Sequence, residues 1–434
     1  MMNKILYTGL FVLVCAARVA AQDNVRSYVR ENIRPVRTIQ PDSSDYSDLE
    51  PLGAAIGDAR VVMLGEQDHG DAPSFLAKTR IIKYLHEKKG FGVLAFESDF
   101  FGLNYGWDSA VKVRGGLDSL LKNNIFPVWT FCDACQPLMR YIPSQARGAN
   151  PLVVTGFDCQ MWSATVARGL DSLMRALRLP IVAAAGYEED VLPALHNWGK
   201  LIKDSAQNGK YLGYLEEIRR QLVEKGLAGG FWVQVVESLQ AADRERVMEG
   251  QPVSGGGAGS YLRPWYARDT QMAANLRWLT EQKFAGKKVI VWAANFHISK
   301  YSGHYTDPRL INEARTMGTV YTGDERMMKQ IYVLGFTSLQ GEAGRITLSQ
   351  YKVPRPGGNA FERWMDGGMA YGFVDFGAYN RGLQGQGESF YMAGGMMVQH
   401  RETKGEWNRV FDGVFYIRDM YPCRTVALGV VWDK

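Results

Sequence analysis

The chain has 434 residues, of which 46% are hydrophobic and 22% are charged, an ordinary globular composition with enough apolar residues for a large core. The formal net charge is +5 and the charges are spread along the chain, which argues against a nucleic-acid-binding protein. The length is compatible with one large domain or with two.

The N-terminal residues have the pattern of a secretory signal peptide, predicted over residues 1–21. Lys4 is followed by an apolar run over 5–17, and 19–21 satisfy the small-residue cleavage rule. The mature domain, 22–434, is therefore expected in the periplasm or outside the cell, with a net charge near +3 and no stable membrane anchor. The alternative is an uncleaved anchor, for which the apolar run is short.

A buried strand is predicted over residues 61–64, an apolar run that stops at Gly65. Glu66 and His69 follow it directly. Ionisable side chains at the end of a buried strand are costly unless they are paired or used. In open α/β sheets, ligands bind beyond the carboxyl ends of the strands, so these two residues are candidates for a site.

A helix is expected next, with Asp71 as its N-cap, Pro73 in its first turn and Gly90 at its end. A second buried strand over 91–96 then ends in Glu97-Ser-Asp99. Strand, helix and strand in this order predict a parallel βαβ unit.

Four cysteines remain after signal cleavage, and three disulfide pairings are possible. They are Cys132, Cys135, Cys159 and Cys423. A structural bridge or buried thiols is favoured over a redox-active Cys-x-x-Cys pair, because no thioredoxin-like pattern precedes it. A four-cysteine zinc site is disfavoured because there is no second Cys-x-x-Cys.

A third strand over 151–157 again ends in a carboxylate, Asp158, which either caps a following helix or belongs to a site. Residues 163–250 have a helical pattern, and the glycine-rich run at 255–260 is typical of a linker. We therefore predict a helical insertion or lid over about 163–260.

A helix over 266–279 carries Arg268 and Asp269, which are either a surface charge pair or part of a site. A fourth strand over 288–293 ends in Asn295-Phe-His297. Four strands that end in polar side chains at one edge of a parallel sheet predict a functional site there. Of the other histidines, His86 and His196 are expected at the surface, whereas His304 and His400 lie in loops and receive no role.

At these residues the chain resembles the erythromycin esterase family, in order over roughly residues 45–420. The segments that carry the resemblance are Gly65-Glu66-Gln-Asp-His69-Gly70, Phe91-x-x-Leu-Ala-Phe-Glu97-Ser-Asp99, Gly156-Phe157-Asp158, Arg268-Asp269-x-x-Met272-x-x-Asn275-x-x-Trp278, Val291-Trp-Ala-Ala-Asn295-Phe-His297 and the expected last strand from Val410. The resemblance implies an α/β fold with a mixed, largely parallel central sheet flanked by helices.

The resemblance also implies a hydrolase that opens an ester or lactone without a metal or other cofactor, and the signal-peptide pattern implies that it is exported. His69 would be the general base that activates water. Glu66 and Glu97 would orient His69 or share its proton, and His297 would stabilise the developing charge. The residues expected to bind the small-molecule substrate are Arg268, Asp99, Asp158 and Asn295.

The chain departs from the family at Ala294, where relatives usually have the first histidine of a His-Asn-x-His motif. Activity could therefore be reduced, redirected or absent. Two alternatives stay open: a metal-dependent hydrolase that uses the same Glu and His side chains as ligands, and an exported binding protein that has lost the chemistry. The sequence leaves the substrate and the oligomeric state open.

Overall fold

The computed structural model describes residues 24–161, 165–197, 205–249, 263–300, 315–346, 348–382, 387–395 and 399–426. The predicted signal peptide, the glycine-rich linker and His304 lie outside these residues. The strands are β1 (Arg34–Pro35), β2 (Val61–Leu64), β3 (Phe91–Asp99), β4 (Val153–Asp158), β5 (Lys288–Trp292), β6 (Ile331–Ala343), β7 (Tyr351–Lys352), β8 (Tyr371–Asp375), β9 (Phe390–Met392), β10 (Thr403–Gly405) and β11 (Gly413–Met420).

The helices begin and end as follows: α2 (Glu50–Ile56), α3 (Ala72–Lys89), α4 (Phe100–Ala110), α5 (Gly116–Asn124), α6 (Pro127–Thr130), α7 (Gln136–Gln145), α8 (Val166–Ala176), α9 (Leu192–Asn197), α10 (Ser205–Leu222), α11 (Phe231–Glu249), α12 (Arg263–Trp278), α13 (Asn295–Ile298), α14 (Met317–Thr322), α15 (Glu325–Met328), α16 (Gly377–Gly382) and α17 (Trp407–Val410). Helix α3 has the predicted ends, with Asp71 before it and Gly90 after it in a left-handed conformation.

The central sheet has nine strands, and its main path runs β1-β8-β11-β6-β2-β5-β3-β4. The strands from β11 to β4 are parallel, whereas β8, β1 and β7 pair antiparallel with their neighbours. The prediction of a mixed, largely parallel sheet flanked by helices is confirmed. Strands β2 and β3 are parallel as predicted, but β5 lies between them, so the βαβ crossover skips one strand position.

Alternate residues of the central strands supply two separate cores, because successive side chains of a strand point to opposite faces. Val61 and Met63 belong to one core, together with residues of α8 to α12. Val62 and Leu64 belong to the other, which α2, α3 and α7 cover. A strand buried on both faces is apolar throughout, which is why 61–64 has no polar alternation.

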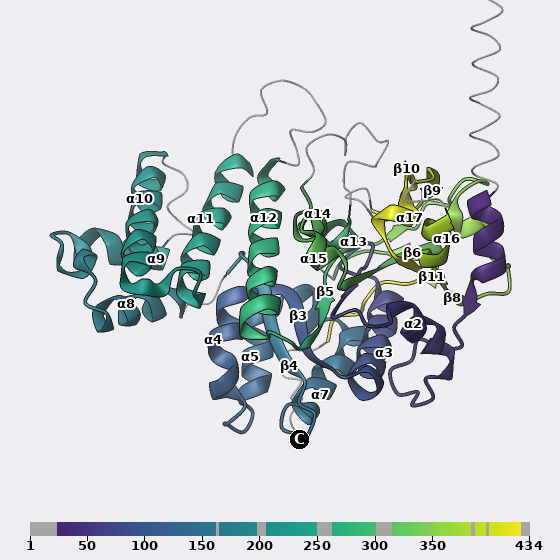
Figure 1. Cartoon of the computed structure of the whole chain (residues 1–434), viewed down its shortest axis with the longest axis horizontal. Coiled ribbons are helices and arrows are strands. Elements are labelled where there is room, and N and C mark those ends of the chain that lie inside the picture. The colour runs from purple at the N-terminus through teal and green to yellow at the C-terminus, as the bar shows by residue number, and fades with distance from the viewer. Residues whose placement is uncertain are drawn as a thin grey trace, which may run out of the picture.

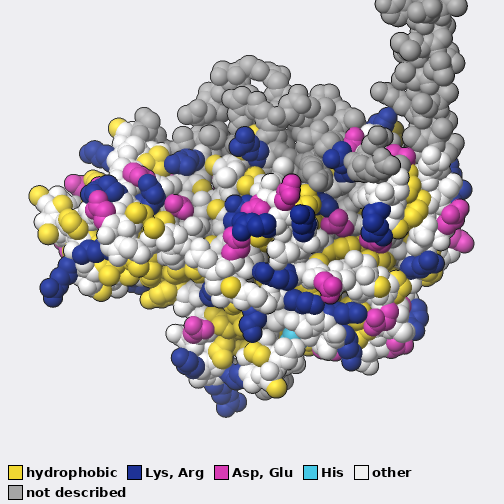
Figure 2. All heavy atoms as spheres, viewed as in Figure 1, with side chains coloured by type: hydrophobic (Ala, Val, Ile, Leu, Met, Phe, Trp, Pro, Cys, Tyr) yellow, Lys and Arg dark blue, Asp and Glu magenta, His cyan; other side chains and the backbone are white. Residues whose placement is uncertain are grey.

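Helices α8 to α11 extend to one side of the sheet and approach it through α12 (Figure 1). The described residues between 165 and 249 contain no strand, in keeping with the predicted helical insertion. In the part of the chain with described structure, no helix is both long enough and apolar enough to span a bilayer. Figure 2 shows Lys and Arg interspersed with Asp and Glu over one face, a mixed surface rather than a single basic field.

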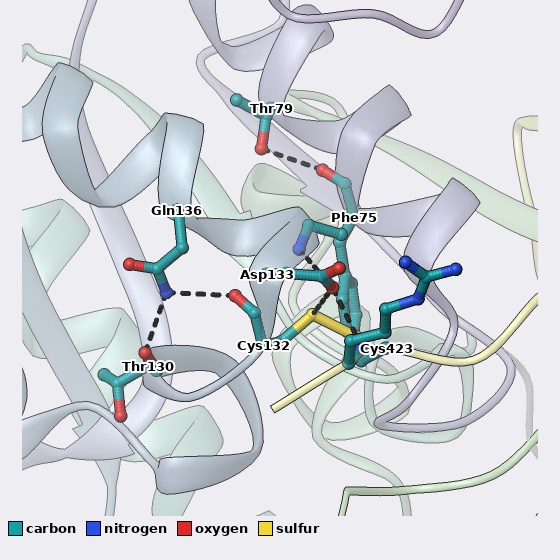
Figure 3. The surroundings of a disulfide bond; sticks show 9 residues. Phe75, Thr79, Thr130, Cys132, Asp133, Gln136 and Cys423 are labelled. Atoms are coloured by element: carbon teal, nitrogen blue, oxygen red, sulfur yellow. Dashed lines mark hydrogen bonds between the residues drawn. A yellow bond between two sulfur atoms is a disulfide. The ribbon is translucent and has the colours of Figure 1, made fainter. Parts of the chain in front are cut away.

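A disulfide joins Cys132 to Cys423 across 291 residues of sequence (Figure 3). Cys135 and Cys159 are buried free thiols. The sequence had left a structural bridge or buried thiols as alternatives and the pairing open, and the structure has one bridge and two buried thiols. Burial raises the pKa of Cys135, which argues against a reactive thiolate. The Cys423 N–H also donates to Gly70 O at 2.9 Å. The C-terminal segment is thereby held beside the turn that follows His69.

Reduction of this disulfide is expected to lower the free energy of unfolding by about 2–5 kcal/mol, because the cross-link restricts the unfolded chain. Urea unfolding followed by tryptophan fluorescence, with and without reductant, measures the change. The Cys135→Ala variant should respond to reductant like the natural chain, whereas the double variant Cys132→Ser, Cys423→Ser should not. Superimposable curves for the natural chain in both conditions would contradict the expectation.

Candidate active site

The carboxyl ends of β2, β5, β3 and β4 meet at one edge of the sheet, because these strands are parallel and adjacent. The predicted convergence of the four strand ends is confirmed. Helix α12 adds Arg268 and Asp269 to the same place. Both side chains are buried, so the interpretation of this pair as surface charges is wrong.

Glu97 is the centre of the cluster, and its carboxylate is almost completely buried. Oε1 lies 3.0 Å from Nη2 of Arg268 and 3.2 Å from Nε2 of His297. Oε2 accepts the backbone N–H of Ala294 at 3.0 Å. Burial alone would raise the pKa of Glu97, but the charge and hydrogen bond of His297 and the nearby His69 and Arg268 hold it well below its usual range.

Asp158 forms a two-point ion pair with Arg268. The Arg268 Nε donates to Oδ1 at 3.1 Å, and Nη2 donates to Oδ2 at 2.5 Å. Helix α8 begins only at Val166, so Asp158 caps no helix here, and the site interpretation is the one that the structure supports. Asp158 thereby fixes the guanidinium that contacts Glu97.

His297 lies between two carboxylates. Its Nδ1 is 2.9 Å from Asp269 Oδ1, and its Nε2 faces Glu97. Burial would lower the pKa of His297, but Asp269 and Glu97 outweigh that effect and raise it to about 10. The ring is therefore an imidazolium at neutral pH, a fixed positive charge in the wall of the site.

His69 is held by Glu66, and Glu66 is held by Lys78. His69 Nδ1 is 3.1 Å from Glu66 Oε1, and the Lys78 ammonium pairs with the other oxygen of Glu66. Glu66 and Lys78 are fully buried, whereas 16% of the His69 side chain is exposed. His69 Nε2 is 4.0 Å from Glu97 Oε1. Trp129 packs edge-on against the His69 ring at a centroid distance of 5.3 Å.

Sequence reasoning missed Lys78 as a member of the site. Its side chain is fully buried, and its Nζ lies 3.9 Å from the centroid of the Trp292 ring. The available signal was spacing: Lys78 lies three residues after Phe75 and four before Ile82, on the apolar face of α3. A lysine on a buried helix face needs a buried carboxylate as its partner.

A cavity of about 510 Å³ opens over this cluster. His69, Glu97, Arg268 and His297 line it together with Ala294. The rest of the wall is made of apolar and uncharged or ion-paired side chains, namely Gln67, Asp68, Phe126, Pro127, Val128, Gln160, Phe296, Arg345, Leu348 and Gln399, with Gly395. A larger hollow of about 710 Å³ lies between α4 and α5, and none of the described residues that line it is a carboxylate, lysine, arginine or histidine.

Three of the four residues expected to bind substrate are absent from this cavity wall. Asp158 lies behind Arg268, to which it is paired. Asp99 caps α4 by accepting the Gly102 N–H at 2.7 Å. Asn295 accepts the Phe336 N–H at 3.0 Å and donates to Phe336 O at 2.7 Å, which ties the end of β5 to β6. Both contacts position the backbone that carries the site.

Among the remaining histidines that the structure describes, one differs from the predicted surface position. His196 is exposed as predicted. His86 is buried between the Tyr141 hydroxyl at 2.7 Å and Asn150 O at 2.8 Å, so its prediction as a surface residue is wrong. It lies four residues after Ile82 on the same buried helix face. His400 is also buried, next to Asp71.

Comparison with known proteins identifies the family. The sequence profile described as erythromycin esterase matches residues 86–420. The Bacillus subtilis strain 168 protein YbfO, whose name assigns it provisionally to the hydrolases, is 23% identical over 94% of each chain. Erythromycin esterase type II of Escherichia coli is 37% identical over 73 residues, which is 17% of each chain.

Solved structures share the fold at low sequence identity. A Bacillus cereus protein superposes with a TM-score of 0.72 at 19% identity and covers 94% of this chain and 99% of its own. A mutant of the erythromycin esterase EreC in its open conformation has a TM-score of 0.66 at 16% identity, with coverages of 91% and 100%. The profile and the relatives support a hydrolase, and the solved structures show that its fold is the mixed α/β fold of this family. The chain belongs to the erythromycin esterase family.

The raised pKa of His297 predicts a specific pH dependence of stability. In the unfolded state, His297 releases its proton around pH 6.5, the ordinary histidine pKa. In the folded state it keeps that proton until the pH approaches about 10. The contribution of His297 to stability is therefore fully present below the lower value and is lost as pH rises through the upper one.

The natural chain should consequently exceed His297→Gln in free energy of unfolding by a margin that shrinks between pH 6 and pH 10. Urea unfolding of both proteins at each pH measures the margin directly, and other titrating groups cancel in the difference. A margin that stays constant or grows with pH would show that His297 is not held protonated.

Proposed function

We propose that the protein is an exported, metal-independent hydrolase that cleaves an ester or lactone with a water molecule activated by His69. The observation that carries this proposal is the pairing of His69 with buried Glu66 at the wall of the cavity. The His69 imidazole is partly exposed, and its hydrogen bond to Glu66 fixes its tautomer. A general base that activates water requires both features.

The tautomer follows from the hydrogen bond. An ionised carboxylate only accepts, so the proton of a neutral His69 ring lies on Nδ1, which faces Glu66. Nε2 then carries the lone pair. Lys78 supports this arrangement, because it pairs with the other oxygen of Glu66 in a fully buried position and so fixes the side chain that faces His69.

The 4.0 Å separation of His69 Nε2 and Glu97 Oε1 is too long for a direct hydrogen bond and short enough for a bridging water. Such a water could donate one proton to each atom at about 2.8 Å. His69 would take its proton as the water oxygen attacks the substrate carbonyl. The imidazolium would then return that proton to the leaving alcohol oxygen when the tetrahedral intermediate collapses.

Positive charge for the oxyanion is available in the same wall. Arg268 and the protonated His297 both line the cavity. Their positions are fixed by Asp158 and Asp269, so they would not have to reorganise during the reaction. Asp158 thus acts through Arg268.

The geometry disfavours the metal-dependent alternative. Arg268, His297 and the Ala294 N–H already occupy the oxygens of Glu97, so a divalent cation would have to displace two cations. Among the described residues, the one set of three ligand-type side chains close enough to share an ion is Cys132, Asp133 and Cys423, whose sulfurs form the disulfide.

Export is supported by the same disulfide, because such bonds form and persist in oxidising compartments such as the periplasm. Together with the signal-peptide pattern of residues 1–21, it makes a periplasmic or secreted protein the proposal for localisation.

A hydrolysis screen of the mature protein on 4-nitrophenyl esters and lactones tests the proposal. We expect turnover that persists in chelator and that falls about 10²–10⁴-fold in kcat in His69→Ala. Glu66→Gln should also lose activity, because the tautomer is no longer fixed. His196→Ala, which removes an exposed histidine of α9, is the matched control and should leave the rate unchanged.

Two results would contradict the proposal. Turnover that disappears with chelator and returns with added metal would indicate a metallohydrolase. A folded protein that turns over no ester or lactone would favour a binding role, and recovery of turnover in Ala294→His would then locate the lost function at Ala294.

A further inference from the structure

A turn at the mouth of the cavity presents a cation beside an apolar side chain. The Leu348 N–H donates to Arg345 O at 3.0 Å, and both side chains line the cavity. The Arg345 side chain is 40% exposed, and Leu348 is 64% exposed. Because both side chains line the cavity at its mouth, the pairing points to a ligand with a charged and an apolar part.

The backbone of this turn is pressed against the loop that carries His69. A Cβ atom on Gly70 would lie 2.1 Å from Gly344 O and 2.9 Å from Arg345 Cα. The two segments therefore meet at a position where only glycine fits. The position of Arg345 relative to His69 is set by main-chain packing and does not depend on a flexible loop.

A buried chain of polar groups also holds Arg345. Its Nε donates to Asp68 Oδ1 at 2.6 Å, and the Tyr351 hydroxyl donates to Asp68 Oδ2 at 3.1 Å. The same hydroxyl is 2.9 Å from Nδ1 of His400. His400 Nε2 is 3.1 Å from Asp71 Oδ2, and His400 and Asp71 are fully buried. Buried ionisable groups are costly to keep, and this chain ends at the guanidinium in the cavity.

Only one edge of that guanidinium is occupied. Among the described residues, the two terminal amino groups of Arg345 have no hydrogen-bond partner. A guanidinium matches a carboxylate with two parallel hydrogen bonds. We propose that Arg345 binds a carboxylate of the substrate, while Leu348 and the apolar wall at Phe126 and Val128 contact its hydrocarbon part.

This inference rests on the proposed function and names its substrate class: esters that carry a free carboxylate on an apolar body. Asp68 acts here as a positioning residue, because it orients Arg345 and its Oδ1 accepts the backbone N–H of His69 at 2.8 Å. The Asp68 carboxylate thus contacts both Arg345, which would bind the substrate carboxylate, and the backbone of His69, the proposed general base.

The test compares two esters that differ in one group, the mono-4-nitrophenyl ester of glutaric acid and its ω-carboxamide analogue. In the natural chain, kcat/KM should favour the carboxylate ester by at least about tenfold. Arg345→Gln should abolish that preference, mainly through a higher KM for the carboxylate ester. Arg345→Lys should keep part of it, because lysine retains the charge but not the two-point geometry.

Arg326→Gln is the matched control, because it removes an exposed arginine at α15 and should keep the preference. Circular dichroism and the urea unfolding curve of each variant show that it is folded. Equal kcat/KM for the two esters in the natural chain, or a preference that survives in Arg345→Gln, would overturn the carboxylate anchor while leaving ester hydrolysis intact.

A binding measurement separates the two proposals if no ester is turned over. Calorimetry with 4-phenylbutyrate and 4-phenylbutyramide needs no catalysis. Binding of the carboxylate alone, lost in Arg345→Gln and retained in Arg326→Gln, would support the anchor although hydrolysis had failed. Equal binding of both compounds, or binding of neither, would overturn it.

Discussion

Glu97 is a carboxylate removed from water that stays ionised only because of its partners, and they come from separate parts of the chain. Arg268 belongs to α12, His297 to α13, and the Ala294 N–H follows β5. Loss of one partner of a buried ion pair typically costs about 3–5 kcal/mol, so these segments are constrained to meet. The parallel order of β2, β5, β3 and β4 is what allows them to do so.

Two further acids around the cavity, Glu66 and Asp68, are also paired with a cation. Lys78 neutralises buried Glu66, which orients His69, and Arg345 pairs with Asp68 next to that histidine. Each acid has a cation that fixes it, so the wall is preorganised. Of the histidines and carboxylates that meet at the strand ends, His69 keeps the largest exposed fraction, and it is the one to which we assign proton transfer.

Much of this site could be predicted from sequence, because four strands end in polar residues and parallel strands bring their ends together. Lys78, His86 and strand β6 were missed for identifiable reasons. The two side chains lie on the buried face of α3, where only their partners distant in sequence, Glu66, Tyr141 and Asn150, make burial tolerable. Residues 331–336 are as apolar as the other strands but end in no ionisable residue, so a search for sites passes over them.

Isotope labelling under single-turnover conditions tests most directly whether His69 activates water. Enzyme in excess over a hydrolysed ester, in water enriched in oxygen-18, should give acid product with one labelled oxygen. Alcohol and acid should then appear at the same rate, with no change in the mass of the protein. A faster release of alcohol, accompanied by an acylated protein in the mass spectrum, would show that a side chain attacks the ester and would contradict direct attack by a water molecule that His69 activates.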